Sequence, residues 1–291
     1  MAITQLIPIL DTHQHLVYAD RWPYAWTAGI PALAGRSFTC DDYRQAIAGA
    51  GIAAALFMET APDDPHGIEE TEYVTRLSAE PENSIVGLIA NCRPENDHFE
   101  AHLDWLDGLP VVGLRRILHV EPDELSGQPR FVRNVGLLAA RGWTFDICTL
   151  QRQLPLAAAL ARQCPDVQFV LDHCGVPDMA TGNFDDWRQG IRQVAELPNV
   201  ACKISGIMAY CKPGEASAAT VRPYVEHCLE AFGWDRVVWG SDWPVCLINV
   251  TLRRWVEITR ELIAGESEEN QRKLLHANAI RLYRVSKAVP R

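Results

Sequence analysis

The 291-residue chain lacks several patterns that mark specialised classes of protein. No apolar run approaches the roughly 20 residues that cross a membrane, so neither a membrane span nor a membrane partner is expected. Lysine and arginine total 27 against 37 aspartate and glutamate, which gives a formal net charge of −10. The basic residues form no block or stripe. Because proteins bind nucleic acids through clustered positive charge, a nucleic-acid partner is not expected either.

The nine cysteines include no Cys-x-x-Cys pair, and their number is odd. Cys148, Cys174 and Cys202 lie in apolar, strand-like runs. Small buried thiols in a reducing compartment explain this pattern better than a disulfide framework. The first five residues, Met-Ala-Ile-Thr-Gln, lack the basic region and the cleavage pattern of a secretory signal. The expected location is therefore the cytoplasm.

Eight short apolar runs, rich in β-branched residues, recur along a chain that is 48% hydrophobic and 22% charged. Each run is bounded by polar or turn residues, which predicts eight buried strands. The predicted strands are Ile7–His13, Ala53–Glu59, Ser84–Ala90, Val111–Ile117, Trp143–Cys148, Val167–His173, Val200–Ser205 and Arg236–Gly240.

Segments with helical apolar spacing separate most of these runs and follow the last one. They are Asp41–Gly49, Glu69–Glu80, Phe131–Arg141, Leu154–Gln163, Trp187–Leu197, Val221–Phe232, Leu252–Ala264 and Ser267–Tyr283. Alternating strands and helices predict a parallel sheet covered by helices. Eight such units in a chain of this length fit a (β/α)₈ TIM barrel of the α/β class, in one domain over residues 1–291. No Gly-x-Gly-x-x-Gly follows the first strand, so a dinucleotide-binding fold lacks its main sequence support.

The most informative stretch is Asp-Thr-His-Gln-His at residues 11–15, where the first predicted strand ends. On a regular strand alternate side chains share a face, so His13 and His15 are expected to point the same way, with Asp11 beside them. Two imidazoles and a carboxylate suit a divalent metal or a polar site that grips a carbonyl oxygen. The alternative is a purely structural role, in which the two histidines only form hydrogen bonds at the end of the strand.

Polar and ionisable residues end the other predicted strands as well. In strand order they are Glu59; Asn91 and Arg93; Arg115, Arg116 and His119; Asp146; Asp172 and His173; Lys203 and Ser205; Ser241 and Asp242. The carboxyl ends of barrel strands open on one face, where active sites lie, so these residues are expected to share a site. Burying a charge is costly unless the charge is paired or takes part in function, so the clustering favours a functional site.

Structural roles remain open for several of these charges. Glu59 and Lys203 could form a buried ion pair that only closes the barrel. Asp146 could cap the following helix, and Asp11 could hold His13 or a strand amide. Asp172 is expected to face away from the histidine that follows it and to be structural.

The substrate side of the site has two sequence candidates. Strand alternation requires one of Arg115 and Arg116 to point outward, and Arg116 is the expected one. The irregular stretch 15–39 carries Trp22, Tyr24 and Trp26, which either cap the end of the barrel or form a wall of the substrate pocket.

Three motifs in order resemble the amidohydrolase-2 branch of the amidohydrolase superfamily. They are the Asp-x-His-x-His stretch, Leu-Asp-His-Cys-Gly at 171–175 and Gly-Ser-Asp-Trp-Pro at 240–244. The similarity continues through residues 113–122, 141–146, 198–206 and 221–225 and so covers nearly the whole chain. The chain looks most like the sugar-lactone hydrolases, a group that contains fuconolactonase, rhamnonolactonase and pyrone-dicarboxylate lactonase.

The resemblance implies a hydrolase that opens the ester ring of a small lactone, most often a sugar-acid lactone of carbohydrate catabolism. By position, His13, His15, His173 and Asp242 match the catalytic set of the family. The expected mechanism uses Asp242 to take a proton from water and to return one to the leaving alkoxide. The histidines, or a metal that they help to hold, would stabilise the oxyanion.

Substrate binding is expected to involve a further set of side chains, with an arginine for carboxylate or hydroxyl groups and aromatic rings over a sugar face. The set is Arg115, Arg116, Trp22, Tyr24, Trp26, Asp146 and Lys203.

The metal content stays open at this stage. The fifth predicted strand ends Phe-Asp-Ile-Cys at 145–148, without the His or Lys that many metal-dependent amidohydrolases carry there. The full binuclear ligand set is therefore missing. One outcome is a single divalent ion, such as zinc, on His13, His15 and Asp242, with Glu59 as a further candidate ligand. The other outcome is a metal-free site.

Related chemistries on the same barrel are lactone isomerisation and non-oxidative decarboxylation of an aromatic acid. A non-catalytic binder of sugar acids is a third alternative. The sequence does not fix the lactone, and it allows an oligomer without indicating its size.

Overall fold

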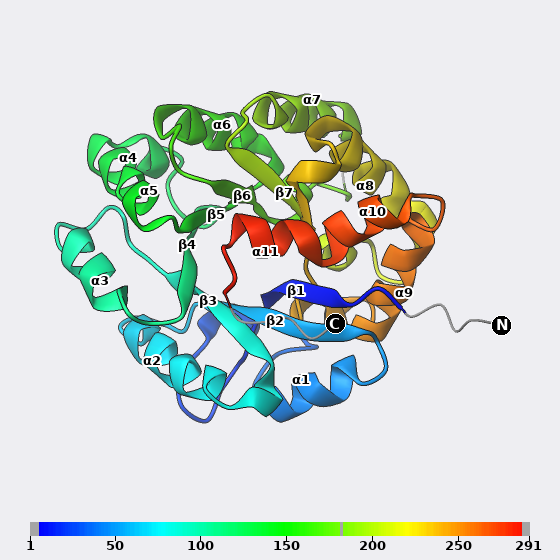
Figure 1. The fold of residues 1–291 in the computed structure, drawn as a ribbon, viewed down its shortest axis with the longest axis horizontal. Helices are drawn as coiled ribbons and strands as arrows, with labels where there is room; N and C mark the ends of the chain where they lie inside the picture. The colour runs from blue at the N-terminus through cyan, green and yellow to red at the C-terminus, as the bar shows by residue number, and fades with distance from the viewer. Residues whose placement is uncertain (1–5, 181–182, 287–291) are drawn as a thin grey trace.

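The computed structural model describes residues 6–180 and 183–286. Eight parallel strands form one sheet in the order β1 to β8, and helices surround it (Figure 1). The strands are β1 (Ile9–Gln14), β2 (Ile52–Met58), β3 (Ile85–Asn91), β4 (Val111–Ile117), β5 (Thr144–Cys148), β6 (Phe169–Leu171), β7 (Val200–Ile204) and β8 (Val237–Trp239). The predicted α/β barrel is confirmed, and each predicted strand overlaps an observed one. Residues 1–5, which carry the prediction that no secretory signal is present, lie outside the described residues.

The helices follow the strands in the order expected of a (β/α)₈ barrel. They are α1 (Cys40–Ile47), α2 (Gly67–Ser78), α3 (Phe99–Leu106), α4 (Pro129–Gly136), α5 (Leu138–Arg141), α6 (Leu154–Gln163), α7 (Phe184–Ala195), α8 (Ala218–Phe232), α9 (Leu252–Leu262), α10 (Glu268–Arg272) and α11 (Asn278–Leu282). The sequence analysis did not predict α3, although Phe99, Leu103 and Leu106 are buried at helical spacing. The predicted closing helix 267–283 is interrupted by a π turn over residues 273–277. None of the described helices is long and apolar enough to span a membrane.

Side chains on the inner face of the strands form a cluster separate from the layer between strands and helices. It contains Leu10, Leu56, Met58, Ile89 and Val238 and continues onto α11 through Leu282 and Tyr283. Helix α11 therefore lies across the end of the barrel at which the strands begin (Figure 1). The polar residues lie at the opposite end of the barrel, where the strands finish.

The barrel closes between β1 and the segment that follows β8. The amide of Asp242 donates to the carbonyl of His13 at 2.8 Å, and the amide of His15 donates to the carbonyl of Trp243 at 2.8 Å. The Thr12 hydroxyl donates to the carbonyl of Trp239 at 2.8 Å. The backbone that closes the barrel is thus the same backbone that carries two histidines and an aspartate of the candidate site.

All nine cysteines are buried free thiols, as the sequence analysis predicts.

Candidate active site

Three histidines and one aspartate meet at the carboxyl ends of the strands. The Nε2 atoms of His13 and His15 lie 3.1 Å apart, and the ring centroids of His13 and His173 lie 4.5 Å apart. Oδ1 of Asp242 lies 3.6 Å from Nε2 of His13 and 3.5 Å from Nε2 of His15. The structure therefore brings together the four residues that the sequence singles out as catalytic candidates.

Asp11 does not join this group, and the prediction that it points with the two histidines is wrong. The pairing of β1 with β2 shifts register between Asp11 and Gln14, so strict alternation fails there. The Asp11 carboxylate instead accepts hydrogen bonds from the Tyr43 hydroxyl at 2.7 Å and from the Ser241 amide at 2.8 Å. Asp11 thus ties β1 to α1 and to the segment that follows β8. Burial raises the pKa of its carboxyl group.

Two of the four site residues have strained backbones. His173 and Asp242 each have a φ of 55°, in the left-handed region that non-glycine residues rarely adopt. Such strain costs about 1–3 kcal/mol per residue and persists only where the surroundings enforce it. For His173 one enforcing contact is the hydroxyl of Ser205, which lies 2.9 Å from its Nδ1. A backbone held this way fixes the direction of the side chain.

Beneath His13 lies a fully buried charge cluster of Lys203, Asp146 and Asp172. Nζ of Lys203 lies 2.6 Å from Asp146 and 2.9 Å from Asp172. The Tyr283 hydroxyl donates to Asp146 at 2.8 Å, so Asp146 does not cap a helix. Lys203 also lies 3.3 Å from Nδ1 of His13.

The prediction that Asp172 faces away from His173 is wrong, because ligand atoms of Asp172, His13 and His173 lie within 4.8 Å of one another. Strand β6 ends at Leu171 and a 3-10 turn over 172–175 begins, so strand alternation does not extend to Asp172. Burial alone would raise the pKa of Asp172, but the charge of Lys203 holds that pKa well below its usual range. Asp172 is therefore an anion at the centre of the barrel, paired with Lys203.

Glu59 pairs with Arg115 rather than with Lys203. Nε of Arg115 donates to the Glu59 carboxylate at 2.6 Å, and Nη2 donates to the Glu59 carbonyl at 2.7 Å. Burial raises the pKa of Glu59, but the charge of Arg115 outweighs it and the net shift is downward. Nη1 of Arg115 lies 3.3 Å from Nε2 of His13, so this guanidinium faces the site. Arg116 points away, as expected, and pairs with Glu95 at 2.7 Å; no contact joins it to the histidines.

Burial keeps two of the site histidines neutral near pH 7. It lowers the pKa of His13 well below the usual value, and the positive charge of Lys203 adds to the effect. Burial also lowers the pKa of His173. A neutral imidazole offers one acceptor nitrogen and one donor, which suits metal binding or a hydrogen bond to a substrate oxygen.

Two further side chains lie at the mouth of the barrel. His119 contacts Sγ of Cys148 through Nδ1 at 3.3 Å, and burial lowers its pKa to about 4. The Tyr210 ring lies 6.3 Å from that of His173. Tyr210 also lines a cavity of about 800 Å³ formed mainly by the loops that follow β5 and β6. His119 could be selected from the sequence because it lies two residues beyond β4. No sequence feature indicated Tyr210.

The aromatic residues of the β1–α1 loop divide between two roles. The Trp22 indole donates to Glu69 at 2.8 Å and packs edge-on against Tyr73, both on α2. The Tyr24 hydroxyl accepts from the amide of Tyr18. These contacts build the cap over the barrel. Trp26 differs, because its indole donates to the carbonyl of Thr60 at 2.9 Å, just beyond the end of β2.

His13, His15 and Asp242 form a group whose ligand atoms fit one divalent ion. Metal bonds of about 2.0–2.2 Å with tetrahedral angles place ligand atoms about 3.3–3.6 Å apart. The three separations, 3.1, 3.5 and 3.6 Å, lie close to that range. Glu59 is not part of this group, because Arg115 engages its carboxylate. A role of Glu59 as a ligand stays a prediction.

Comparisons with known proteins show which sequences and structures this chain resembles. L-fucono-1,5-lactonase of Burkholderia multivorans is 28% identical over 268 residues, which cover 85% of this chain and 88% of that protein. L-rhamnono-gamma-lactonase of Scheffersomyces stipitis is 24% identical over 200 residues and covers 60% and 59%. A crystal structure of an amidohydrolase from Burkholderia multivorans with bound zinc superposes with a TM-score of 0.87 at 25% identity, covering 96% of this chain and 99% of that one. The amidohydrolase family model matches residues 10–285, and the chain belongs to that family.

Proposed function

We propose that this protein hydrolyses the ester ring of a small lactone, a sugar-acid lactone in the first instance. The observation that carries the proposal is the set of charged groups that pair with Asp242 and with the other acidic residues of the site. Among the described residues it pairs with no lysine or arginine, whereas Glu59, Asp146 and Asp172 all do. Asp242 is thus the acidic group at the strand ends that is left to exchange protons with water and substrate. Two relatives that carry lactonase names support the choice of substrate class.

Hydrolysis of a lactone needs a proton to leave the attacking water and a proton to reach the leaving oxygen. Asp242 accepts the first as water attacks the carbonyl carbon, and it returns that proton to the ring oxygen as the ester bond breaks. The product is an open-chain hydroxy acid, and the carboxyl group of Asp242 is restored to its ionised form. Oδ1 of Asp242 already faces His13 and His15, which leaves Oδ2 for the proton.

The negative charge that develops on the carbonyl oxygen requires donors fixed in advance. His173 and the guanidinium of Arg115 can supply such donors, and they are positioned by Ser205 and Glu59 respectively. Because these groups are almost fully buried, little water competes with them for the oxyanion. Their rigidity means that little reorganisation accompanies the reaction.

One divalent ion, with zinc the first candidate, would be held by His13, His15 and Asp242. Such an ion would polarise the carbonyl and lower the pKa of a bound water. The zinc-containing amidohydrolase structure supports this assignment. Asp146, Asp172 and Lys203 lie beneath this set and support His13, so we do not place Asp146 and Lys203 in contact with substrate.

Substrate recognition is assigned to the rim of the site. Arg115 offers a guanidinium edge beside His13, and Trp26 and Tyr210 offer aromatic faces for a sugar ring. The cavity beside Tyr210 gives room for hydroxyl-bearing carbons of a sugar acid.

The test is a panel of 1,5- and γ-lactones of sugar acids, assayed by acid release in weak buffer. A parallel panel of hydroxybenzoates is assayed for carbon dioxide. We expect acid release from at least one lactone and no carbon dioxide. Folded protein that binds sugar acids in calorimetry but opens no lactone, or that decarboxylates a hydroxybenzoate, would overturn the proposal.

A further inference from the structure

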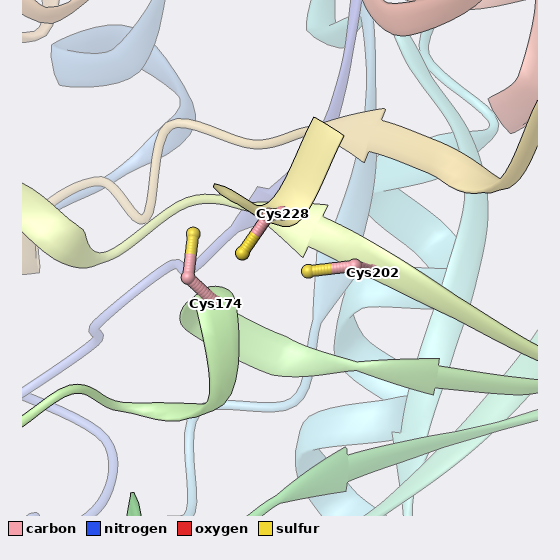
Figure 2. A group of neighbouring side chains, drawn as sticks. All are labelled: Cys174, Cys202 and Cys228. Atoms are coloured by element: carbon pink, nitrogen blue, oxygen red, sulfur yellow. The ribbon is translucent and has the colours of Figure 1, made fainter. Parts of the chain in front are cut away.

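Three cysteines far apart in the sequence converge behind the active site. Cys174 follows His173, Cys202 lies on β7 and Cys228 lies on α8. Their Sγ atoms all lie within 4.8 Å of one another, and all three residues are fully buried. Figure 2 shows the three sulfurs gathered between β7 and the turn after β6. Within the described part of the chain no other three cysteines gather in this way.

We propose that Cys174, Cys202 and Cys228 form a binding site for one thiophilic d¹⁰ metal ion, such as zinc or its analogue cadmium. Thiolate sulfurs are the ligands that select such soft ions over magnesium or calcium. A metal–sulfur distance of about 2.3 Å places three ligand sulfurs about 3.8–4.0 Å apart. The sulfurs already lie within 4.8 Å, so a sub-ångström contraction completes the geometry.

The backbone around Cys174 is held in a way that ordinary core packing does not require. Its φ is 53°, and the Trp187 indole donates to its carbonyl at 2.8 Å. This strained conformation places Sγ beside the other two sulfurs, within 3.8 Å of the Lys203 carbonyl.

A bound ion offsets most of the negative charge that three thiolates bring. A divalent ion that displaces three thiol protons leaves one net negative charge, which is less costly to bury than the charge of free thiolates. The other cysteines contact a backbone carbonyl or a single side chain, as Cys92 and Cys164 do.

The test uses cadmium, because sulfur–cadmium charge transfer absorbs in the near ultraviolet and nitrogen or oxygen ligands do not produce it. Native protein is titrated with cadmium under anaerobic, reducing conditions, with long incubation because the thiols have no solvent exposure. We expect one equivalent of the band per chain. Cys228→Ala and Cys202→Ala are expected to lose it, and Cys164→Ala, another buried cysteine, is expected to keep it. No band in the wild type, or a band that survives Cys228→Ala, overturns the proposal.

A second measurement needs no variant. X-ray absorption at the cadmium edge of the one-equivalent wild-type complex should show three sulfur neighbours. Only nitrogen and oxygen neighbours would place the ion at the histidine and aspartate group and overturn the cysteine site. The proposed lactonase reaction is independent of this result, since its assay contains no cadmium.

Discussion

At the scale of single residues, the partners of the acidic groups decide which of them can do chemistry. Glu59, Asp146 and Asp172 each lie within 2.9 Å of an arginine or lysine nitrogen. The paired charges lower the pKa values of Glu59 and Asp172, so these two carboxylates are held as anions and do not readily exchange a proton. Asp242 faces only imidazoles, and a small movement of water or substrate reaches it. The four carboxylates thus have distinct roles although the sequence presents them in the same way.

Replacing Asp242 with Asn removes the proposed proton acceptor without changing the shape of the side chain. We expect lactone turnover to fall by about 10²–10⁴-fold, which is the usual contribution of a general base. The temperature of thermal unfolding should change little. The control is Asp185→Asn on the exposed face of α7, which should change neither the unfolding temperature nor the lactone turnover. Turnover near the wild-type rate in the Asp242 variant would remove it from the mechanism.

Lys203 is expected to contribute to stability rather than to substrate binding. Replacing it with Met leaves two buried carboxylates without a counter-charge, which costs about 3–5 kcal/mol in the free energy of unfolding. Lys273 is a matched control, since it also bridges two carboxylates, Asp235 and Glu269, but at the surface. Urea unfolding of both variants measures the difference. Equal, small effects for Lys203→Met and Lys273→Met would show that the buried cluster is not coupled as the structure indicates.

Glu70 provides a pH-dependent test away from the site. Burial, together with the charge of Glu59, raises the pKa of Glu70 well above 4.5. A raised folded-state pKa means that the native state favours the protonated form, so its stabilising contribution is lost as the pH rises through that pKa. Glu70→Gln mimics the protonated form and can still accept from the amide of Thr60. Its melting temperature should therefore exceed that of the wild type by more at pH 8 than at pH 5.

The control on the same helix is Glu72→Gln, at an exposed position. It should change the melting temperature equally at the two pH values. A Glu70→Gln gain that is constant or larger at pH 5 would contradict the assigned direction of the shift.

At the scale of elements, strands were easier to predict than the directions of their last side chains. Near-continuous apolar runs with polar ends located all eight strands, because burial on both faces leaves a strong signal. Asp11 and Asp172 were assigned to the wrong faces, since a register shift and a 3-10 turn interrupt alternation just where the site begins. Neither departure has a local sequence signature. The partners of Lys203 also depend on which strands face each other across the barrel, which no single segment reveals.

The turn after β7 positions His173 through the small size of Gly206. A Cβ at Gly206 would lie 2.3 Å from Nδ1 of His173, and its φ is +63°. Gly206→Ala is expected to displace the imidazole and reduce kcat by at least tenfold. Gly233 has a similar φ of +68° but nothing within 4 Å of an added Cβ.

Gly233→Ala also places a side chain at a positive φ, which costs about 1–3 kcal/mol, but without the collision. It should lose stability and retain kcat. If both variants lose activity equally, strain rather than contact with His173 explains the effect. Steady-state kinetics and thermal unfolding on the two proteins separate the outcomes.

At the scale of the whole molecule, the hydrogen bonds that close the barrel also form the site. The bonds that join β1 to the segment after β8 fix the backbones of His13, His15 and Asp242 together. A ligand that binds these side chains therefore bridges the first and last strands. Since it binds only the closed barrel, it should stabilise the entire fold rather than one loop.

Zinc added to chelator-treated protein should consequently raise the midpoint of global unfolding. At a hundredfold excess over the dissociation constant the expected gain is about 2.7 kcal/mol. His15→Asn removes one of the three ligands at the strand ends and should abolish the part of the gain that comes from this site. Cys228→Ser leaves those ligands intact and should retain that part, losing only what zinc at the cysteine site adds. Differential scanning calorimetry measures the shifts, and lactone turnover before and after chelation shows whether activity follows the same ion. A shift that disappears with Cys228→Ser but survives His15→Asn would place the stabilising ion among the cysteines and leave the histidines to polarise the carbonyl unaided.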